Sequence, residues 1–201
     1  MPLTKVQLFR REILKGHAAP PDLRALLYVI AEAGDGVDPL REALNHSLLI
    51  SGRDYPLLSA SYLNEKDRQN PDIMANVAAI NEVLAMITFV AESDDGDMIG
   101  YWHGPERTPI DAAPIVKLDT EGQFDLMQGR TLSEAMLGNY TFGDDERFAA
   151  GRAWLAACGI EMDAVNWHGL STPTAATLPK KLHRTLYNER RVAAGLKPIG
   201  R

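Results

Sequence analysis

The stretch FVAESDDGDMIGYWHG, residues 89–104, decides how the middle of the chain folds. It gathers four acidic residues around Gly96, between two apolar runs. Asp-Gly pairs are favoured in type I′ turns because both central positions must tolerate positive φ. The pattern therefore predicts a β-hairpin whose turn presents Asp94, Asp95 and Asp97 to solvent as an acidic tip.

Two chemical interpretations of the same acids are weaker. A Ca²⁺ loop needs oxygen ligands at alternating positions and a distal bidentate acid, but here Gly96 falls between the acids and no acid occupies the twelfth position. A glycosidase-like pair needs two carboxylates across a cleft, one of them in an apolar pocket. Acids crowded around a turn face water instead, so we expect neither a metal site nor catalytic carboxylates here.

A second hairpin follows the first along the chain. PIVKLD (114–119) and QFDLMQ (123–128) have strand character and are separated by a turn at Thr120, Glu121 and Gly122. Apolar residues at helical spacing precede the hairpins over 6–13, 23–30 and 73–84. Residues 40–70 are mixed, and we expect short helix and loop there.

Helices also follow the hairpins. Thr131 and Glu134 have the spacing of a capping box, which predicts a helix start, and two further helices are expected before Gly195. We therefore predict a single α+β domain over residues 1–201, with a central antiparallel sheet of two consecutive hairpins packed with N- and C-terminal helices. Its divisions are a helical part at 1–70, a core at about 71–140 and a helical extension at 144–197.

Composition places the protein among ordinary globular chains. The hydrophobic fraction is 45% and the single cysteine, Cys158, excludes an internal disulfide framework. No run of eighteen apolar residues suggests a membrane span, and charges interrupt what would be the apolar part of a signal peptide at residues 1–16. We expect a cytoplasmic protein that does not bind membranes.

Charge divides unevenly along the chain. Residues 179–201 hold seven lysines and arginines and one acid, which gives a net charge of +6. The whole chain has a net charge of −6, so residues 1–178 carry −12. An acidic body of this kind repels nucleic acid and attracts basic partners. We therefore expect a protein partner and no nucleic acid.

No established catalytic motif occurs in the chain. The five histidines show no metal-ligand spacing, and GLSTP (169–173) is not a nucleophile elbow. Cys158 lies on an alanine-rich helix face, so a structural thiol is favoured over a nucleophile paired with His168. We assign no catalytic residue, metal ligand or cofactor.

Two segments, FVAESDDGDMIGYW and APIVKLDTEGQFDLMQGRTLSEAML, resemble the SUKH superfamily. This group contains yeast cell-wall-synthesis regulators, the SecY-interacting protein Syd and many immunity proteins against polymorphic toxins. The similarity lies in the order of the elements. Two strands joined by an acidic turn with a glycine are followed by a second such pair of strands, and then by a helix. The matching positions are Asp94, Asp95, Gly96 and Asp97, then Pro114–Asp119 with Glu121 and Gly122, then a helix opening at Thr131.

The resemblance implies a non-catalytic protein-binding module, and for the bacterial members a toxin neutralised by occlusion of its basic active-site face. The residues expected to contact the partner are Asp94, Asp95, Asp97, Tyr101, Trp102 and Glu121. Strand alternation directs one of the two aromatic residues towards the core. Two alternatives stay open: a small-substrate enzyme with a pocket between helices and sheet, using a pair such as Asp119 with His103, and a regulatory scaffold that docks through its basic C-terminal helix.

Overall fold

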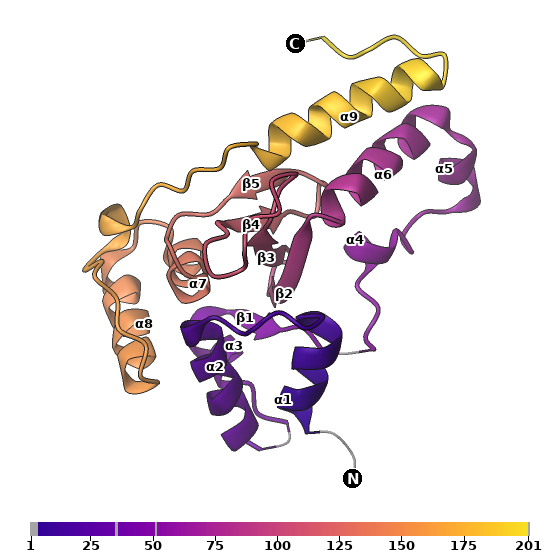
Figure 1. Cartoon of the computed structure of the whole chain (residues 1–201). Helices are drawn as coiled ribbons and strands as arrows, with labels where there is room; N and C mark the ends of the chain where they lie inside the picture. The colour runs from indigo at the N-terminus through magenta and orange to yellow at the C-terminus, as the bar shows by residue number, and fades with distance from the viewer. Residues whose placement is uncertain (1–3, 35, 51, 201) are drawn as a thin grey trace.

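The computed structural model of the protein describes residues 4–34, 36–50 and 52–200. Within these ranges, five strands form one antiparallel sheet in the order β1-β2-β3-β4-β5, so each strand pairs with its neighbour in sequence (Figure 1). The predicted α+β class and both predicted hairpins, β2-β3 and β4-β5, are confirmed. The strands are β1 His46–Leu48, β2 Ile87–Ser93, β3 Met98–Trp102, β4 Ile115–Leu118 and β5 Phe124–Leu126.

The first strand, β1, was not predicted. It is only three residues long and follows a short helix, α3 (Pro39–Leu44), so it is too short to show an alternating pattern. Its pairing with the far half of β2 makes it an edge strand of the sheet. The N-terminal third of the chain therefore contributes directly to the sheet.

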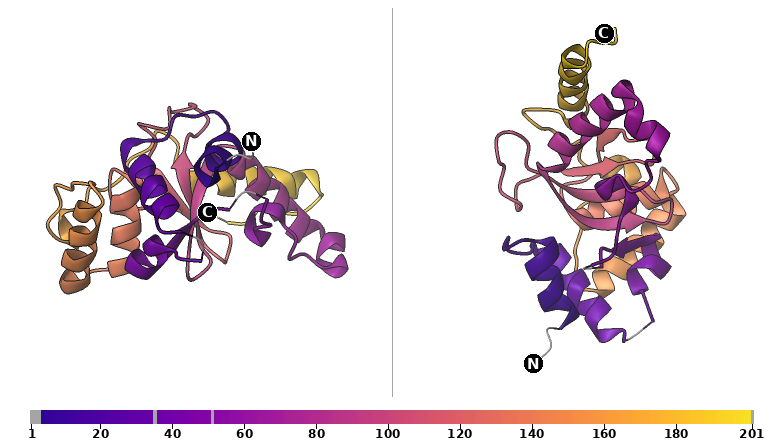
Figure 2. Two further views of the ribbon diagram at one scale, coloured as in Figure 1. Left: turned by 90° about the horizontal axis from the view of Figure 1, so that it is seen from below. Right: turned by 90° about the vertical axis from the view of Figure 1, so that its right-hand side faces the viewer.

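Helices cover both faces of the sheet, which gives a three-layered arrangement (Figure 2). One face packs against α2 (Pro21–Glu32), α3, α7 (Leu132–Thr141) and α8 (Asp145–Ala157). The other packs against α6 (Pro71–Leu84) and α9 (Pro179–Ala193). The short elements are α1 Lys5–Leu8, the π-helical turn η1 Phe9–Ile13, α4 Pro56–Ser59, α5 Glu65–Gln69 and the 3₁₀ turn η2 Trp167–Gly169.

Local signals in the sequence account for two helix starts. The Asn70 side chain accepts hydrogen bonds from the amides of Asp72 and Ile73 and caps α6. Thr131 caps α7 by accepting from the Glu134 amide at 3.2 Å. The predicted capping box is modified. The Glu134 carboxylate accepts from the Arg130 amide at 2.6 Å, one residue before the cap, and not from the amide of Thr131.

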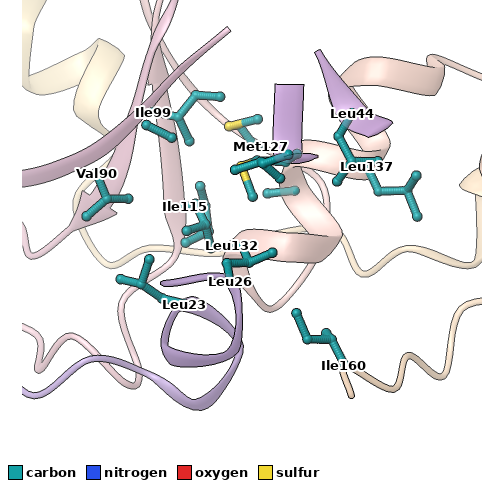
Figure 3. Close-up of a cluster of buried hydrophobic side chains, with 14 of the residues drawn as sticks. Leu23, Leu26, Leu44, Val90, Ile99, Ile115, Met127, Leu132, Leu137 and Ile160 are labelled. Atoms are coloured by element: carbon teal, nitrogen blue, oxygen red, sulfur yellow. The ribbon is translucent and has the colours of Figure 1, made fainter. Parts of the chain in front are cut away.

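Burial of β3 on both faces ties the layers together. Ile99 and Tyr101 face the cluster under α2 and α7, whereas Met98 and Trp102 face the cluster under α6 and α9. Figure 3 shows the first cluster. Its labelled residues include Val90, Ile99 and Ile115 of the sheet, Leu23 and Leu26 of α2, and Leu132 and Leu137 of α7.

A β-bulge in β2 sits against Gly100. Phe89 pairs with Gly100 and Ala91 with Ile99, so Val90 is an extra residue in β2. A Cβ on Gly100 would lie 2.6 Å from the Thr88 carbonyl oxygen and 2.7 Å from the Phe89 Cα. Only glycine permits this approach of the two backbones.

We expect Gly100→Ala to lower the free energy of unfolding by about 2–3 kcal/mol, because the added methyl group meets backbone that cannot move aside. Urea denaturation followed by circular dichroism would measure the loss. Gly169→Ala is the matched control: its Cβ would meet neighbours at 3.6 Å, and its effect should stay within about 0.5 kcal/mol. Equal losses in the two variants would contradict the role given to Gly100.

Candidate functional site

The turn between β2 and β3 differs from the predicted type I′ turn. The Gly96 amide donates to the Ser93 carbonyl at 2.9 Å, and the Ser93 amide donates to the Asp97 carbonyl at 2.9 Å. Gly96 has a φ of +87°, whereas Asp95 does not have positive φ. This is a type I turn closed by a glycine bulge, so the type I′ prediction was wrong, although the hairpin and the need for glycine are confirmed.

The turn between β4 and β5 has the same construction. The Gly122 amide donates to the Asp119 carbonyl and the Asp119 amide to the Gln123 carbonyl, both at 3.0 Å. The Asp119 carboxylate also accepts from the amides of Glu121 at 3.0 Å and Gln123 at 2.8 Å. These bonds fix the backbone that carries Glu121.

The two turns lie side by side. Because β3 pairs with β4, both turns emerge at the same end of the sheet, and a Cβ on Gly96 would lie 3.4 Å from the Thr120 side chain. Asp94, Asp95, Thr120 and Glu121 are exposed there. We call these four residues the turn edge.

Contacts with α3 and β4 hold the first turn in place. The Asp94 carboxylate lies 2.9 Å from Arg41 Nε, and the Asp94 amide donates to the Asn45 carbonyl at 2.9 Å. Asp97 is only 8% exposed and pairs with Lys117 at 3.1 Å. The expectation that Asp97 belongs to a solvated tip was therefore wrong: it anchors the turn from below.

A buried polar cluster lies beneath the turn edge. Lys117 Nζ is 3.5 Å from the Asn139 side-chain oxygen, and the Asn139 amide nitrogen is 3.5 Å from His46 Nε2. His46 is 1% exposed and donates from Nδ1 to the Leu44 carbonyl at 2.5 Å. Burial lowers the pKa of His46, and the Leu44 carbonyl and the charges of the three nearby aspartates only partly oppose this.

A groove of about 380 Å³ opens beside the turn edge. Leu57, Ile80 and Leu118 contribute apolar lining, and Glu121 forms part of the wall. Tyr62 also lines it and is 53% exposed. Tyrosine is enriched at protein–protein interfaces and among their hot spots.

Sequence reasoning missed Tyr62 and the supporting cluster. Tyr62 lies in the stretch that we expected to be irregular, and the residues of the cluster come from three separate segments. No local pattern brings such residues together, because pairing of β1 with β2 and packing of α7 on the sheet place them.

Tyr101 and Trp102 are both buried, at 3% and 1% exposed. Successive side chains of a strand point to opposite faces of the sheet, so one of the two would be exposed if one face met water. Here helices cover both faces. The Trp102 indole donates to the Thr177 carbonyl at 2.9 Å. Burial, and then the charge of Asp22, raise the pKa of Tyr101. The expectation that these two residues contact a partner directly is therefore corrected.

The pair considered for an enzyme, Asp119 and His103, is not brought together. Asp119 lies at the turn end of the sheet, whereas His103 follows β3 at the opposite end. The His103 ring bonds Thr88 at 2.8 Å and the Thr108 carbonyl at 2.7 Å. Among the described residues, no three histidine, cysteine or acidic side chains are grouped closely enough to hold a metal ion.

Cys158 ends α8 and is partly buried. Burial raises the pKa of its thiol, which disfavours the reactive thiolate. A structural thiol is consistent with this environment.

A second hollow of about 420 Å³ lies between η1, the C-terminal end of α6 and β2. Leu49, Leu84 and Phe89 give it an apolar floor. The Tyr55 hydroxyl at its side accepts from the Ile50 amide at 2.6 Å, and burial raises the pKa of Tyr55. Thr88 also lines this hollow, and its hydroxyl lies 2.8 Å from His103 Nε2.

The basic C-terminal helix packs on the body of the protein. Arg191 and the Tyr187 hydroxyl both contact the Asp72 carboxylate, and these hydrogen bonds lower the pKa of Asp72. Arg190 pairs with Glu82 in the same way. The basic charge of α9 therefore neutralises carboxylates of α6, which leaves the turn edge acidic.

Comparisons with known proteins assign no family. The chain matches no protein-family model, no curated protein and no solved structure. Across the described residues, the helices are too short or too polar to cross a bilayer.

We expect the stability of the protein to fall as the pH drops below about 6.5, partly because of His46. The folded state lowers the pKa of His46, so the unfolded chain takes up a proton first and is favoured as the pH falls through the ordinary value for histidine. His46→Asn keeps a donor for the Leu44 carbonyl and removes the titration. Urea midpoints at pH 7.5 and 5.5 should differ less in this variant than in the wild type.

His183 contributes to this effect in the same direction, since burial lowers its pKa as well. The exposed His168→Asn variant serves as a control and should keep the wild-type difference between the two midpoints. An unchanged pH dependence in His46→Asn would contradict the part assigned to His46.

Proposed function

We propose that this chain is a SUKH-like protein-binding module, and that it acts as a cytoplasmic immunity protein that occludes the basic active-site face of a toxin. The observation that carries the proposal is the turn edge. It places the exposed carboxylates of Asp94, Asp95 and Glu121 on two adjacent, hydrogen-bonded turns. Its groove adds the exposed Tyr62.

The construction of the turn edge suits recognition of a basic surface. Turns that are already ordered lose little conformational freedom on binding. Exposed carboxylates at one end of an acidic body would steer a basic partner, and such steering raises association rates to about 10⁸–10⁹ M⁻¹s⁻¹ at low salt. Tyr62 would supply the aromatic anchor that rim charges alone lack.

We expect the tagged full-length chain to retain one basic polypeptide from a lysate of its own host at low salt, and to release it as the salt concentration rises. That polypeptide should be toxic when expressed without this chain. Identification by mass spectrometry and a co-expression growth assay would check both expectations.

Charge reversal tests whether the turn edge is the contact. Asp95→Lys combined with Glu121→Lys should lower the association rate of the identified partner about tenfold or more at low salt, with a smaller effect at high salt. Glu189→Lys reverses an exposed carboxylate on α9 and should change the rate much less. Retention of the partner by the double variant at the wild-type rate would rule out the turn edge, and a bait that retains no partner would count against the immunity role.

A further inference from the structure

The end of α7 carries a phenylalanine that the fold does not need. Phe142 is 85% exposed and has a φ of +37°. Helices commonly end on a residue in this left-handed conformation, but that residue is usually glycine, or sometimes asparagine. A bulky side chain is strained there. Phe142 therefore combines an unfavourable backbone with an apolar ring that stays in water.

The Phe142 ring belongs to a group of neighbouring aromatic residues. Its centroid is 6.0 Å from that of Trp167 in an edge-on contact, and His168 lies edge-on to Trp167 at 5.3 Å. The Trp167 indole donates to the Gly138 carbonyl at 3.0 Å, and the Phe142 amide donates to the same carbonyl at 3.1 Å. Val165, two residues before Trp167, is 65% exposed. We call Phe142, Val165, Trp167 and His168 the aromatic corner.

Such a surface has the features of a binding hot spot. Aromatic residues are enriched at the centres of interfaces, and rigid rings lose little entropy on binding. Strain that the fold does not require points to a function at the strained residue. The aromatic corner shares no residue with the turn edge, and the inference from it does not depend on the function proposed above.

Acidic residues surround the aromatic corner and select its partner. Asp144, Asp145 and Glu146 follow Phe142 after Gly143 and are exposed, and the adjacent Arg147 is already paired with Asp144 at 3.4 Å. Asp163, on the other segment, is 89% exposed at its side chain and pairs with Arg130 at 2.9 Å, so Asp145 and Glu146 supply the unpaired negative charge of the described residues here. Two copies of this chain would bring like charges together, so self-association through this surface is disfavoured. We propose that the aromatic corner docks a basic protein surface, with Phe142 as its anchor.

Site-specific photo-crosslinking in cells of the host tests this. The photoreactive amino acid p-benzoylphenylalanine replaces His168 as a reporter in the full-length chain, because His168 is exposed and contacts Trp167. We expect one discrete adduct with a basic protein, identified by mass spectrometry. The same reporter at Tyr28, an aromatic residue of α2 that is 53% exposed, should give no such adduct.

A second variant separates binding from folding. Phe142→Asn places a residue that tolerates the left-handed backbone at the end of α7, so its urea midpoint should equal or exceed that of the wild type. The same change should reduce the His168 adduct at least fivefold. A triple reversal of Asp144, Asp145 and Glu146 to lysine should also reduce it.

Three results would overturn the proposal. The first is no adduct at His168, or an adduct with an acidic protein or with a second copy of this chain. The second is an adduct that persists in Phe142→Asn. The third is a clear drop of the urea midpoint in Phe142→Asn, which would give Phe142 a structural role instead.

Discussion

The close approach of β3 to β2 at Gly100 is the contact on which the rest of the sheet depends. It accommodates the bulge at Val90, and the bulge directs Val90 and Ala91 into the same buried cluster. After the bulge, residues 91–93 of β2 pair with β1 on the other edge of the strand. That pairing brings α3 and Asn45 against the first turn, where Arg41 and the Asn45 carbonyl hold Asp94. A side chain at position 100 would therefore disturb the turn edge through a chain of backbone contacts.

Packing of the helices determines which charged side chains of this protein are paired. The basic residues of α9 lie against α6, where they neutralise carboxylates that would otherwise face water. Exposed pairs of this kind each contribute little to stability, because water and salt screen them. At the turns themselves, Arg41 pairs with Asp94 and Lys117 pairs with Asp97. The Asp97–Lys117 pair is more buried, and its burial costs solvation of both charges. The pair fixes the orientation of the first turn relative to β4.

Much of the fold follows from local sequence signals. Apolar spacing and the Asn70 and Thr131 caps place α6 and α7, and glycine positions place both hairpins. The errors arise where distant segments decide the outcome. The acidic run resembles a solvated tip, yet β4 supplies Lys117 to bury Asp97, and the second helical layer buries an aromatic pair that alternation alone would split. The exposed carboxylates of the candidate site were predictable from sequence, whereas Tyr62 and the His46 cluster required the tertiary structure.

The groups with perturbed pKa values differ in how far a ligand can reach them. His46 and Tyr101 are shifted by burial, and their burial also keeps substrates away. Tyr55, by contrast, lines an open hollow to which Glu12 and Thr88 also contribute. Catalysis needs a shifted group that a substrate can reach, with a partner within hydrogen-bonding distance. Two exposed aromatic rings of the described residues lie near carboxylates: Tyr62 in the groove beside the turn edge and Phe142 at the aromatic corner. Rings of this kind gain stability when another protein covers them.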